Sequence, residues 1–419
     1  MKKIISLMLV LSVAFSALAL AGCDDERRNE KQQSDTSSST SSSKTVQKKK
    51  EEDKPMKVSV DENKPKISHE QLSQLNKKVL DAQETPKFTC KSENINAESI
   101  SKGKSVTFIP KSNDDSYCKR LTSTFKLAAG SAGFDPANVK IATTDGSASS
   151  LSEALAKSVE DKTDAAILAG NINKDDIENA IEITQANGEE VFSAGSKGLG
   201  QSDYYVDYTV PINYQRAGEL MTDWGIVKSN AKINALAINC TDSEISETVF
   251  SGFKAEFEKY VSSENGYCTT LNVKTSDIGS KLTDSVKKAL TSDSNINYIF
   301  IFDEAAISDV VLAASQVNTK VRIIAAGASV EAFEAVESGN IEMLVASSYE
   351  WTAYAIVDYV LRVFGGLTLP AEQDVPLKIV TKEIIQKNVK SYDGPSYDGY
   401  HEICFGSDFV PGYSGLWNK

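Results

Sequence analysis

Histidine and positive charge are what this chain has least of. Its 419 residues include only two histidines, His69 and His401, and 58 acidic side chains outnumber 45 basic ones, for a net charge of -13. Binding of nucleic acid needs a basic surface that displaces counterions from phosphates, so no nucleic-acid partner is expected. Ser-His-Asp, Cys-His and histidine-rich zinc sites need histidines within the fold, and both histidines lie outside the region of alternating strands and helices. We therefore expect no enzyme activity, no metal and no cofactor.

The N-terminus has the pattern of an export signal. Lys2 and Lys3 precede an apolar run over residues 4–21, which ends in Leu20-Ala21-Gly22-Cys23. The run is marginally long enough for a transmembrane anchor, but positive residues, an apolar core and small residues at its end are typical of a cleavable signal. The tetrapeptide resembles the bacterial lipobox. This resemblance implies a signal peptide over 1–22, lipidation of Cys23 and attachment to the outer face of the cell membrane.

Five further cysteines follow, and their pairing stays open. The cell exterior permits disulfides, but an odd number leaves at least one thiol unpaired unless two chains are cross-linked. No pair has CxxC spacing, so the sequence gives little support to a redox site. The five are Cys90, Cys118, Cys240, Cys268 and Cys404.

Two segments separate the signal from the main fold. Residues 23–66 are rich in Ser, Thr, Lys, Glu and Gln and hold few apolar residues, which predicts a disordered tether that lifts the folded part off the membrane. Residues 67–103 are predicted as a helical lead-in, because Leu72, Leu75, Val79 and Leu80 recur at helical spacing.

From residue 104 the chain alternates short apolar runs with amphipathic stretches. Apolar runs bridged by helices are typical of parallel sheets covered on both faces, and two successive sets of about five predict two doubly wound α/β lobes. The first set of strands is predicted at 105–109, 139–142, 164–169, 191–194 and 204–210, and the second at 233–238, 270–273, 298–302, 321–326 and 343–346. Ligands of such sheets bind at the carboxyl ends of the strands.

The order of several motifs resembles the type 1 periplasmic binding proteins, in the branch that binds ribose and galactose. The resemblance extends over about residues 104–389. It rests on Val106–Pro110 with the following loop and helix, Thr163–Leu168, Asn213–Glu219, Ser251-Gly252-Phe253, Asn297–Glu304, Gly339-Asn340-Ile341 and Leu377–Thr381.

The family fold implies three hinge crossovers between the lobes and closure around a small molecule. The expected N-terminal lobe comprises 104–210 and 348–371, and the expected C-terminal lobe comprises 211–347 and 372–395. Residues 396–419 are expected to form a C-terminal tail. Together with Tyr392, its residues Tyr397, Tyr400, His401 and Trp417 form a late cluster, which we interpret as a tail packed over one lobe rather than as a site.

Candidate ligand contacts follow from alignment with the family and from the ends of the strands. The aromatic expected to stack on a sugar falls at Tyr117, and Tyr349 and Trp351 follow the second crossing. The full set of expected contacts is Asp115, Tyr117, Asn171, Ser196, Asn213, Glu247, Phe302, Asp303, Gly327, Ser347, Tyr349 and Trp351.

The aligned positions depart from the family's usual hydrogen-bonding set. An Asp-Arg pair is replaced by Gly195-Ser196, the acid at the crossing by Asn213, and an aspartate after a strand by Gly327. Unpaired hydroxyls are costly when buried, so either the ligand is less polar than a monosaccharide or its partners come from elsewhere.

The resemblance implies the substrate-binding lipoprotein of an ABC-type importer, which captures a small, sugar-like solute and delivers it to a membrane permease. A membrane-tethered sensor that presents its solute to a receptor or kinase is the alternative. A hydrolase on the same fold is a third hypothesis, disfavoured by the residues above.

Overall fold

The computed structural model describes residues 56–58, 64, 66–194, 205–317, 320–370, 375–388 and 397–418. All of them belong to one compact unit, Glu51–Lys419. The signal segment, Cys23 and most of the expected tether lie outside the described residues, as do Ser196 and Tyr392.

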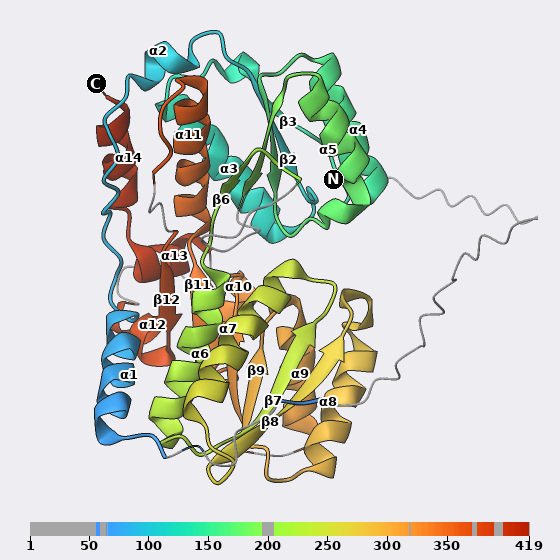
Figure 1. Ribbon diagram of the computed structural model, residues 1–419, viewed down its shortest axis with the longest axis vertical. Helices are drawn as coiled ribbons and strands as arrows, with labels where there is room; N and C mark the ends of the chain where they lie inside the picture. Colours follow the sequence, from blue (N-terminus) through green and yellow to red (C-terminus); the bar gives the residue numbers. More distant parts are fainter. Residues whose placement is uncertain are drawn as a thin grey trace, which may run out of the picture. The chain divides into compact units, whose positions relative to one another are not determined.

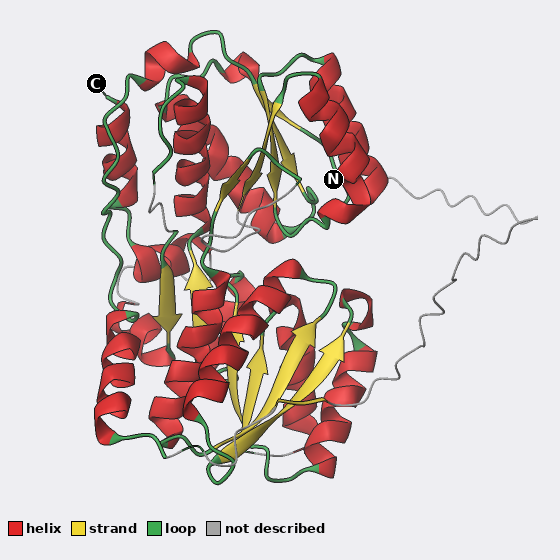
Figure 2. Ribbon diagram, in the orientation of Figure 1, coloured by secondary structure: helices red, strands yellow, loops and turns green. Residues whose placement is uncertain are grey.

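The first lobe is built on a parallel sheet with the strand order β3-β2-β4-β5-β6. Residues of β2 and β4 are buried throughout, as expected for strands covered on both faces. Helices α3 and α11 contribute to the core on one face, and α4 and α5 to the core on the other (Figure 2). The strands are β2 (Val106–Pro110), β3 (Val139–Ile141), β4 (Ala165–Ala169), β5 (Glu190–Ala194) and β6 (Tyr208–Val210), and the helices are α3 (Ser116–Ser131), α4 (Ala148–Glu160), α5 (Glu178–Ala186) and α11 (Tyr349–Phe364).

The second lobe contains a seven-stranded sheet with the order β1-β8-β7-β9-β10-β11-β12. Its five inner strands are parallel, and the two outer strands pair antiparallel with their neighbours. The strands are β1 (Met56–Val58), β7 (Ile233–Cys240), β8 (Gly266–Val273), β9 (Tyr298–Ile301), β10 (Arg322–Ala326), β11 (Met343–Ser347) and β12 (Leu377–Val380). Helices α6 (Tyr214–Ser229) and α7 (Glu244–Tyr260) cover one face, and α8 (Ser280–Ser292), α9 (Ile307–Val317), α10 (Val330–Ser338) and α12 (Lys382–Asn388) cover the other.

Between the first strand of the first sheet, β2, and the last strand of the second, β12, the chain passes from one lobe to the other three times, as the family resemblance implied (Figure 1). It leaves the first sheet after β6 to form α6, leaves the second sheet after β11 to form α11, and returns to the second sheet as β12. A bridge between Ile212 and Val375 joins the first and third crossings. Strands and helices of both lobes therefore follow the α/β pattern predicted from the sequence.

Helices α6 and α7 pack so closely that each needs a glycine at the point of contact. A Cβ atom added to Gly252 of the Ser251-Gly252-Phe253 motif would collide with the backbone of Gln215, and one added to Gly218 would collide with the backbone of Val249. The two helices pack backbone against backbone, which leaves no room for a side chain at either glycine.

The segments outside the two sheets depart from the expected boundaries. Residues 56–58 lie within the expected tether but form β1, which pairs with β8, and Val58 is buried. The lead-in holds α1 (His69–Asp81), as its apolar spacing predicted, and a short helix, α2 (Ala97–Ser101). Helix α1 buries Leu75 and Val79 against the second lobe, whereas Ile95 joins the core of the first.

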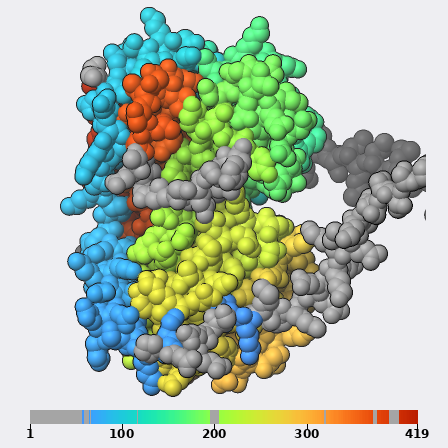
Figure 3. Space-filling view, in the orientation of Figure 1, coloured from blue at the N-terminus to red at the C-terminus, as the bar shows by residue number. Residues whose placement is uncertain are grey.

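The C-terminal tail contacts both lobes, so the prediction that it packs over one lobe is wrong. Tyr400 and Phe405 of α13 (Tyr397–Phe405) belong to a core of the second lobe, and Tyr413 and Trp417 lie in the core of the first. Helix α14 (Phe409–Trp417) also binds the lead-in: the Ile95 amide donates to the Leu416 carbonyl at 2.7 Å. Figure 3 shows the lead-in lying on the surface along one side of both lobes.

All five described cysteines are unpaired, and four of them are buried. Burial raises the pKa of the Cys118 thiol to about 11 and that of the Cys240 thiol to about 12. These side chains are thus neutral thiols at neutral pH and fill the core as small apolar groups.

Candidate functional site

A cavity of about 1340 Å³ lies between the two lobes. Its lining includes residues that directly follow parallel strands: Lys111 follows β2, Asn171 lies just beyond β4, Phe302 follows β9 and Gly327 follows β10. Both sheets thus point their carboxyl ends at the cavity, where ligands of doubly wound sheets bind.

Tyrosines from three helices form an aromatic wall of this cavity. The rings of Tyr117 and Tyr349 meet edge to face, with centroids 4.3 Å apart and planes at 77°. Tyr214, the first residue of α6, also lines the cavity. Burial raises the pKa of Tyr117 and Tyr214, and the charge of Glu304 raises both further. The hydroxyl groups are therefore neutral at neutral pH and can donate hydrogen bonds.

Five acidic residues line the cavity: Glu331 and Glu334 belong to α10, and Asp115, Asp303 and Glu304 lie near its aromatic wall. Two of these last three also hold the ends of helices. Asp115 accepts a hydrogen bond from the Cys118 amide at 2.8 Å and caps α3. Asp303 accepts from the Ala305 amide at 3.1 Å and from the Ser243 hydroxyl at 2.7 Å. Such caps fix the direction of each side chain at the start of its helix.

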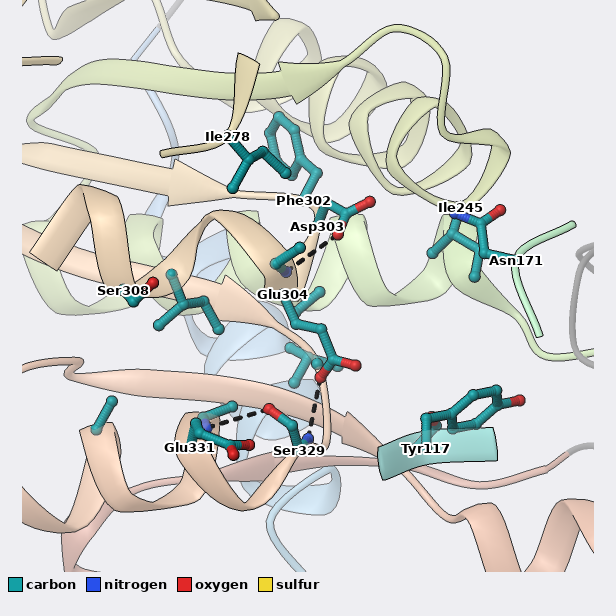
Figure 4. A pocket seen from close by; sticks show the side chains of 18 of the residues that line it. Tyr117, Asn171, Ile245, Ile278, Phe302, Asp303, Glu304, Ser308, Ser329 and Glu331 are labelled. Atoms are coloured by element: carbon teal, nitrogen blue, oxygen red, sulfur yellow. Dashed lines mark hydrogen bonds between the residues drawn. The ribbon is translucent and has the colours of Figure 1, made fainter. Parts of the chain in front are cut away.

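The third carboxylate, Glu304, is held across the gap between two strand ends. Its Oε2 accepts hydrogen bonds from the Ala328 and Ser329 amides at 2.8 and 3.0 Å, and Tyr349 donates to Oε1 at 3.3 Å. Figure 4 shows the carboxyl group reaching from the end of β9 to Ser329. Burial raises the pKa of Glu304, the two amides lower it, and the charges of Asp303 and Asp115 raise it, with a net rise.

Gly327 makes room for this glutamate. A Cβ atom at position 327 would lie 2.6 Å from Cβ of Glu304 and 2.7 Å from its Oε2, well inside contact distance. A family aspartate aligned with Gly327 would therefore occupy the place that Glu304 fills. Glu304, which follows the neighbouring strand β9, thus places its carboxyl group where the resemblance puts that aspartate.

The two lobes also contact each other beside the cavity. Asn171 donates from Nδ2 to the Ser243 hydroxyl at 2.9 Å, and the same hydroxyl donates to Asp303. Lys174, which is buried, forms an ion pair with Glu244 at 3.5 Å. These contacts join the end of β4 in the first lobe to the start of α7 in the second.

Most of the expected contact residues line this cavity. Those brought together are Asp115, Tyr117, Asn171, Phe302, Asp303, Gly327, Ser347 and Tyr349. The expectation for Ser196 falls outside the described residues.

Three expected contacts lie elsewhere in the described structure. Asn213 caps α6 by accepting from the Arg216 amide at 2.9 Å, and Glu247 accepts from Asn239 at 2.7 Å. The indole of Trp351 is buried between aromatic rings, with its centroid 5.2 Å from that of Phe409 and 5.9 Å from that of Phe88. Since none of the three is among the described lining residues, we leave them out of the proposed site.

Lys111, Tyr214 and Glu304 line the cavity but were missed from the sequence. Tyr214 follows the chosen Asn213, and Glu304 follows the chosen Asp303. One position changes the direction of a side chain by about 100° on a helix and by about 180° on a strand. An alignment that slips by one residue can therefore select a neighbour of the side chain that lines the cavity, as with Asn213 and Tyr214.

A second polar cluster lies at the start of α11. Arg120 donates to Oε1 of Glu350 at 2.7 Å, while His401 Nε2 lies 2.8 Å from Oε2 of Glu350 and 2.6 Å from the Ser348 hydroxyl. Burial alone would raise the pKa of Glu350, but His401 and Arg120 together hold it below its ordinary value. Because serine and glutamate contact the same imidazole nitrogen, the group lacks the serine-histidine-acid relay of a hydrolase.

None of the helices in the described part of the chain is both long and apolar enough to span a membrane. In the same part of the chain, no three or more His, Cys, Asp or Glu side chains are grouped so that they could hold a metal ion.

Comparison with known proteins identifies the class that this fold and cavity define. A family model described as a periplasmic binding protein domain matches residues 106–368, more than half of the chain. The chain therefore belongs to the periplasmic binding protein family, whose members bind solutes and are not enzymes. No curated protein sequence matches it.

Solved structures share the fold at low sequence identity. A glucose-galactose binding protein, GanP, from Geobacillus stearothermophilus is 14% identical with a TM-score of 0.57, and the match covers 67% of this chain and 98% of that one. The binding protein of the arabinose ABC transporter from Shewanella sp. ANA-3 is 12% identical with a TM-score of 0.58, covering 71% and 98%. A carbohydrate transporter from Acidothermus cellulolyticus 11B, in complex with myo-inositol, is 15% identical with a TM-score of 0.53, covering 68% and 97%.

Proposed function

We propose that this chain is the substrate-binding lipoprotein of an ABC-type importer. It captures a small, sugar-like solute in the cavity between the lobes and presents it to a permease in the membrane. The observation that carries this proposal is the cavity itself, because the carboxyl ends of both sheets face it and Tyr117, Tyr214 and Tyr349 line it. The sugars and the cyclitol named for the structural neighbours supply the solute class.

The proposed route of binding uses the aromatic wall and the carboxylates together. The faces of tyrosine rings pack on the C–H groups of a sugar ring, and carboxylates accept hydrogen bonds from its hydroxyl groups. The contacts of Asn171 and Lys174 between the lobes would then hold the closed form around the solute.

A thermal-shift screen tests the solute class. Monosaccharides, small polyols and nucleosides are added to the purified protein, and a bound solute raises the melting temperature by mass action. We expect a sugar or polyol to raise it, and Tyr117→Ala to remove that rise while the variant still unfolds cooperatively. Trp351→Ala is the matched aromatic control: it should lower the melting temperature itself but leave the shift caused by the solute. A solute whose shift survives Tyr117→Ala would contradict binding in this cavity.

A second experiment tests the lipid anchor. In cells labelled with radioactive palmitate, the wild type should carry label and sediment with membranes, and Cys23→Ser should do neither. Cys90→Ser serves as the control, because it removes a thiol far from the lipobox. Membrane attachment that persists in Cys23→Ser without label would contradict the lipoprotein assignment.

A further inference from the structure

Glu304 is half-buried at the cavity and differs from the buried acids Asp358 and Glu350 in having no cation beside it in any described ion pair. Elsewhere Asp358 pairs with Arg362 at 2.8 Å, and Glu350 pairs with Arg120. The charges of Asp303 and Asp115 raise the pKa of Glu304, and no ion pair among the described residues joins any of the three acids to a base. Lys111 lines the same cavity, but no described ion pair links it to any of the three acids.

Partial burial disfavours the charged form of Glu304, and a cation that enters the cavity would offset that cost. Withdrawing carboxylates from water is unfavourable when no opposite charge accompanies them. Glu304 is nevertheless held in place by two backbone amides and by Tyr349. The absence of a side chain at Gly327 leaves room for it. The protein thus positions a carboxylate at the cavity without supplying its counter-charge.

We propose that the solute carries a positively charged amine, which binds against Glu304 within the wall of Tyr117, Tyr214 and Tyr349. The amine donates hydrogen bonds to Oε1 of Glu304, the oxygen that accepts only the longer bond from Tyr349. Tyrosine rings favour a cation through the negative potential of their faces. The chemical class is a small hydroxylated amine, of which an amino sugar is the simplest example. This inference rests on the proposed function, because it takes the cavity as the solute site.

Isothermal titration with matched pairs tests the charge directly. The probes are glucosamine against glucose and galactosamine against galactose, which differ only in an amine for a hydroxyl group, with ethanolamine and putrescine as amines that lack a sugar ring. At neutral pH an amine-bearing probe should bind more tightly than its neutral partner. Glu304→Gln should weaken that binding about tenfold or more, since a hydrogen bond to a charged group is lost.

Two variants serve as controls. Glu331→Gln removes the same charge from an exposed position on the same cavity, and it should change the affinity less than about threefold because water screens exposed charges. Lys111→Met removes a competing positive charge, and it should strengthen amine binding.

The outcomes separate this inference from the proposed function. If neutral sugars bind and none of the four amines binds more tightly than they do, the inference is wrong and the proposed function stands. If an amine binds and Glu304→Gln leaves its affinity unchanged, the inference is also wrong. If no amine and no neutral solute binds, both fail.

Discussion

Glu304 and Glu350 occupy similar places in the chain but different surroundings. Both lie within three residues of the carboxyl end of a parallel strand in the second sheet, Glu304 after β9 and Glu350 after β11. Glu350 is buried between Arg120 and His401, and its pKa is lowered. Glu304 is half-buried, accepts only neutral donors, and its pKa is raised.

The difference separates an acid that is paired within the protein, Glu350, from one that we propose the solute pairs with, Glu304. A paired carboxylate stabilises the native state and costs a great deal when its partner is removed. A carboxylate without a cation destabilises the ligand-free protein and is free to recognise a partner of opposite charge.

Removing the cation from a buried ion pair should lower the free energy of unfolding more than any other change. Arg362→Met leaves Asp358 buried with only the indole of Trp417 as a described side-chain donor, at 3.0 Å. We expect the free energy of unfolding, measured by urea denaturation, to fall by about 3–5 kcal/mol. Lys157→Met breaks the surface pairs of Lys157 with Glu160 and Asp161 and should change the free energy of unfolding by less than about 1 kcal/mol. Equal losses in the two variants would show that the buried pair is no more important than the surface one.

Filling the space beside the unpaired acid should have the next largest effect. Gly327→Ala places a methyl group against Glu304, and we expect a loss of about 1–3 kcal/mol from overpacking. In a double-mutant cycle Glu304→Ala should recover part of that loss, because the clashing atoms are gone. Gly130→Ala is the control: its added Cβ meets nothing within 4 Å in α3, so it should stabilise the protein slightly. Additive effects of Gly327→Ala and Glu304→Ala would contradict a clash between position 327 and Glu304.

Breaking the contact between the lobes should have a smaller effect. Asn171→Ala removes the hydrogen bond to Ser243, for an expected loss of about 0.5–1.5 kcal/mol. Small-angle scattering should also show a larger radius of gyration for the variant without solute. Asn173→Ala removes an exposed bond to Asp176 and should leave that radius unchanged. An unchanged radius in both variants would mean that Asn171 does not hold the lobes together.

The smallest effect is the dependence of stability on pH at Glu304. Its pKa in the folded protein lies above the ordinary value of 4.5, so the folded state binds the proton more tightly than the unfolded state. Stability of the solute-free wild type therefore falls as pH rises from about 4.5 through the raised pKa. Glu304→Gln lacks this loss, and above that window it should be more stable by up to about 1 kcal/mol, since the site is partly solvated. Thermal unfolding at a series of pH values checks the sign: a variant that is less stable at neutral pH than at pH 4 relative to wild type would contradict it.

Patterns within single elements made much of the fold predictable. The apolar runs at 164–169 and 298–302 became β4 and β9, and the spacing of Leu75 and Val79 correctly indicated α1. The family motifs indicated the order of the elements and the three crossings. Eight expected contact residues line the cavity, because the end of a parallel strand is a place that the sequence itself marks.

Contacts between distant segments were not predictable in the same way. Trp351 looked like a ligand contact, but Phe88 of the lead-in and Phe409 of the tail enclose it, and both lie far from it in the sequence. His401 lies outside the α/β pattern along the chain, and the tail carries it to Glu350.

The sequence by itself determined the two α/β halves, the strand ends at which a solute would bind and the net acidity of the chain, because periodicity and composition are local properties. Only the tertiary structure decided which acids acquire a cation. That outcome depends on side chains such as Arg120 and His401, which are distant along the chain but adjacent once the helices pack. The tertiary structure also decided that position 327 must be glycine beside Glu304. The clash that a Cβ atom would make there involves two neighbouring strands and cannot be read from either strand alone.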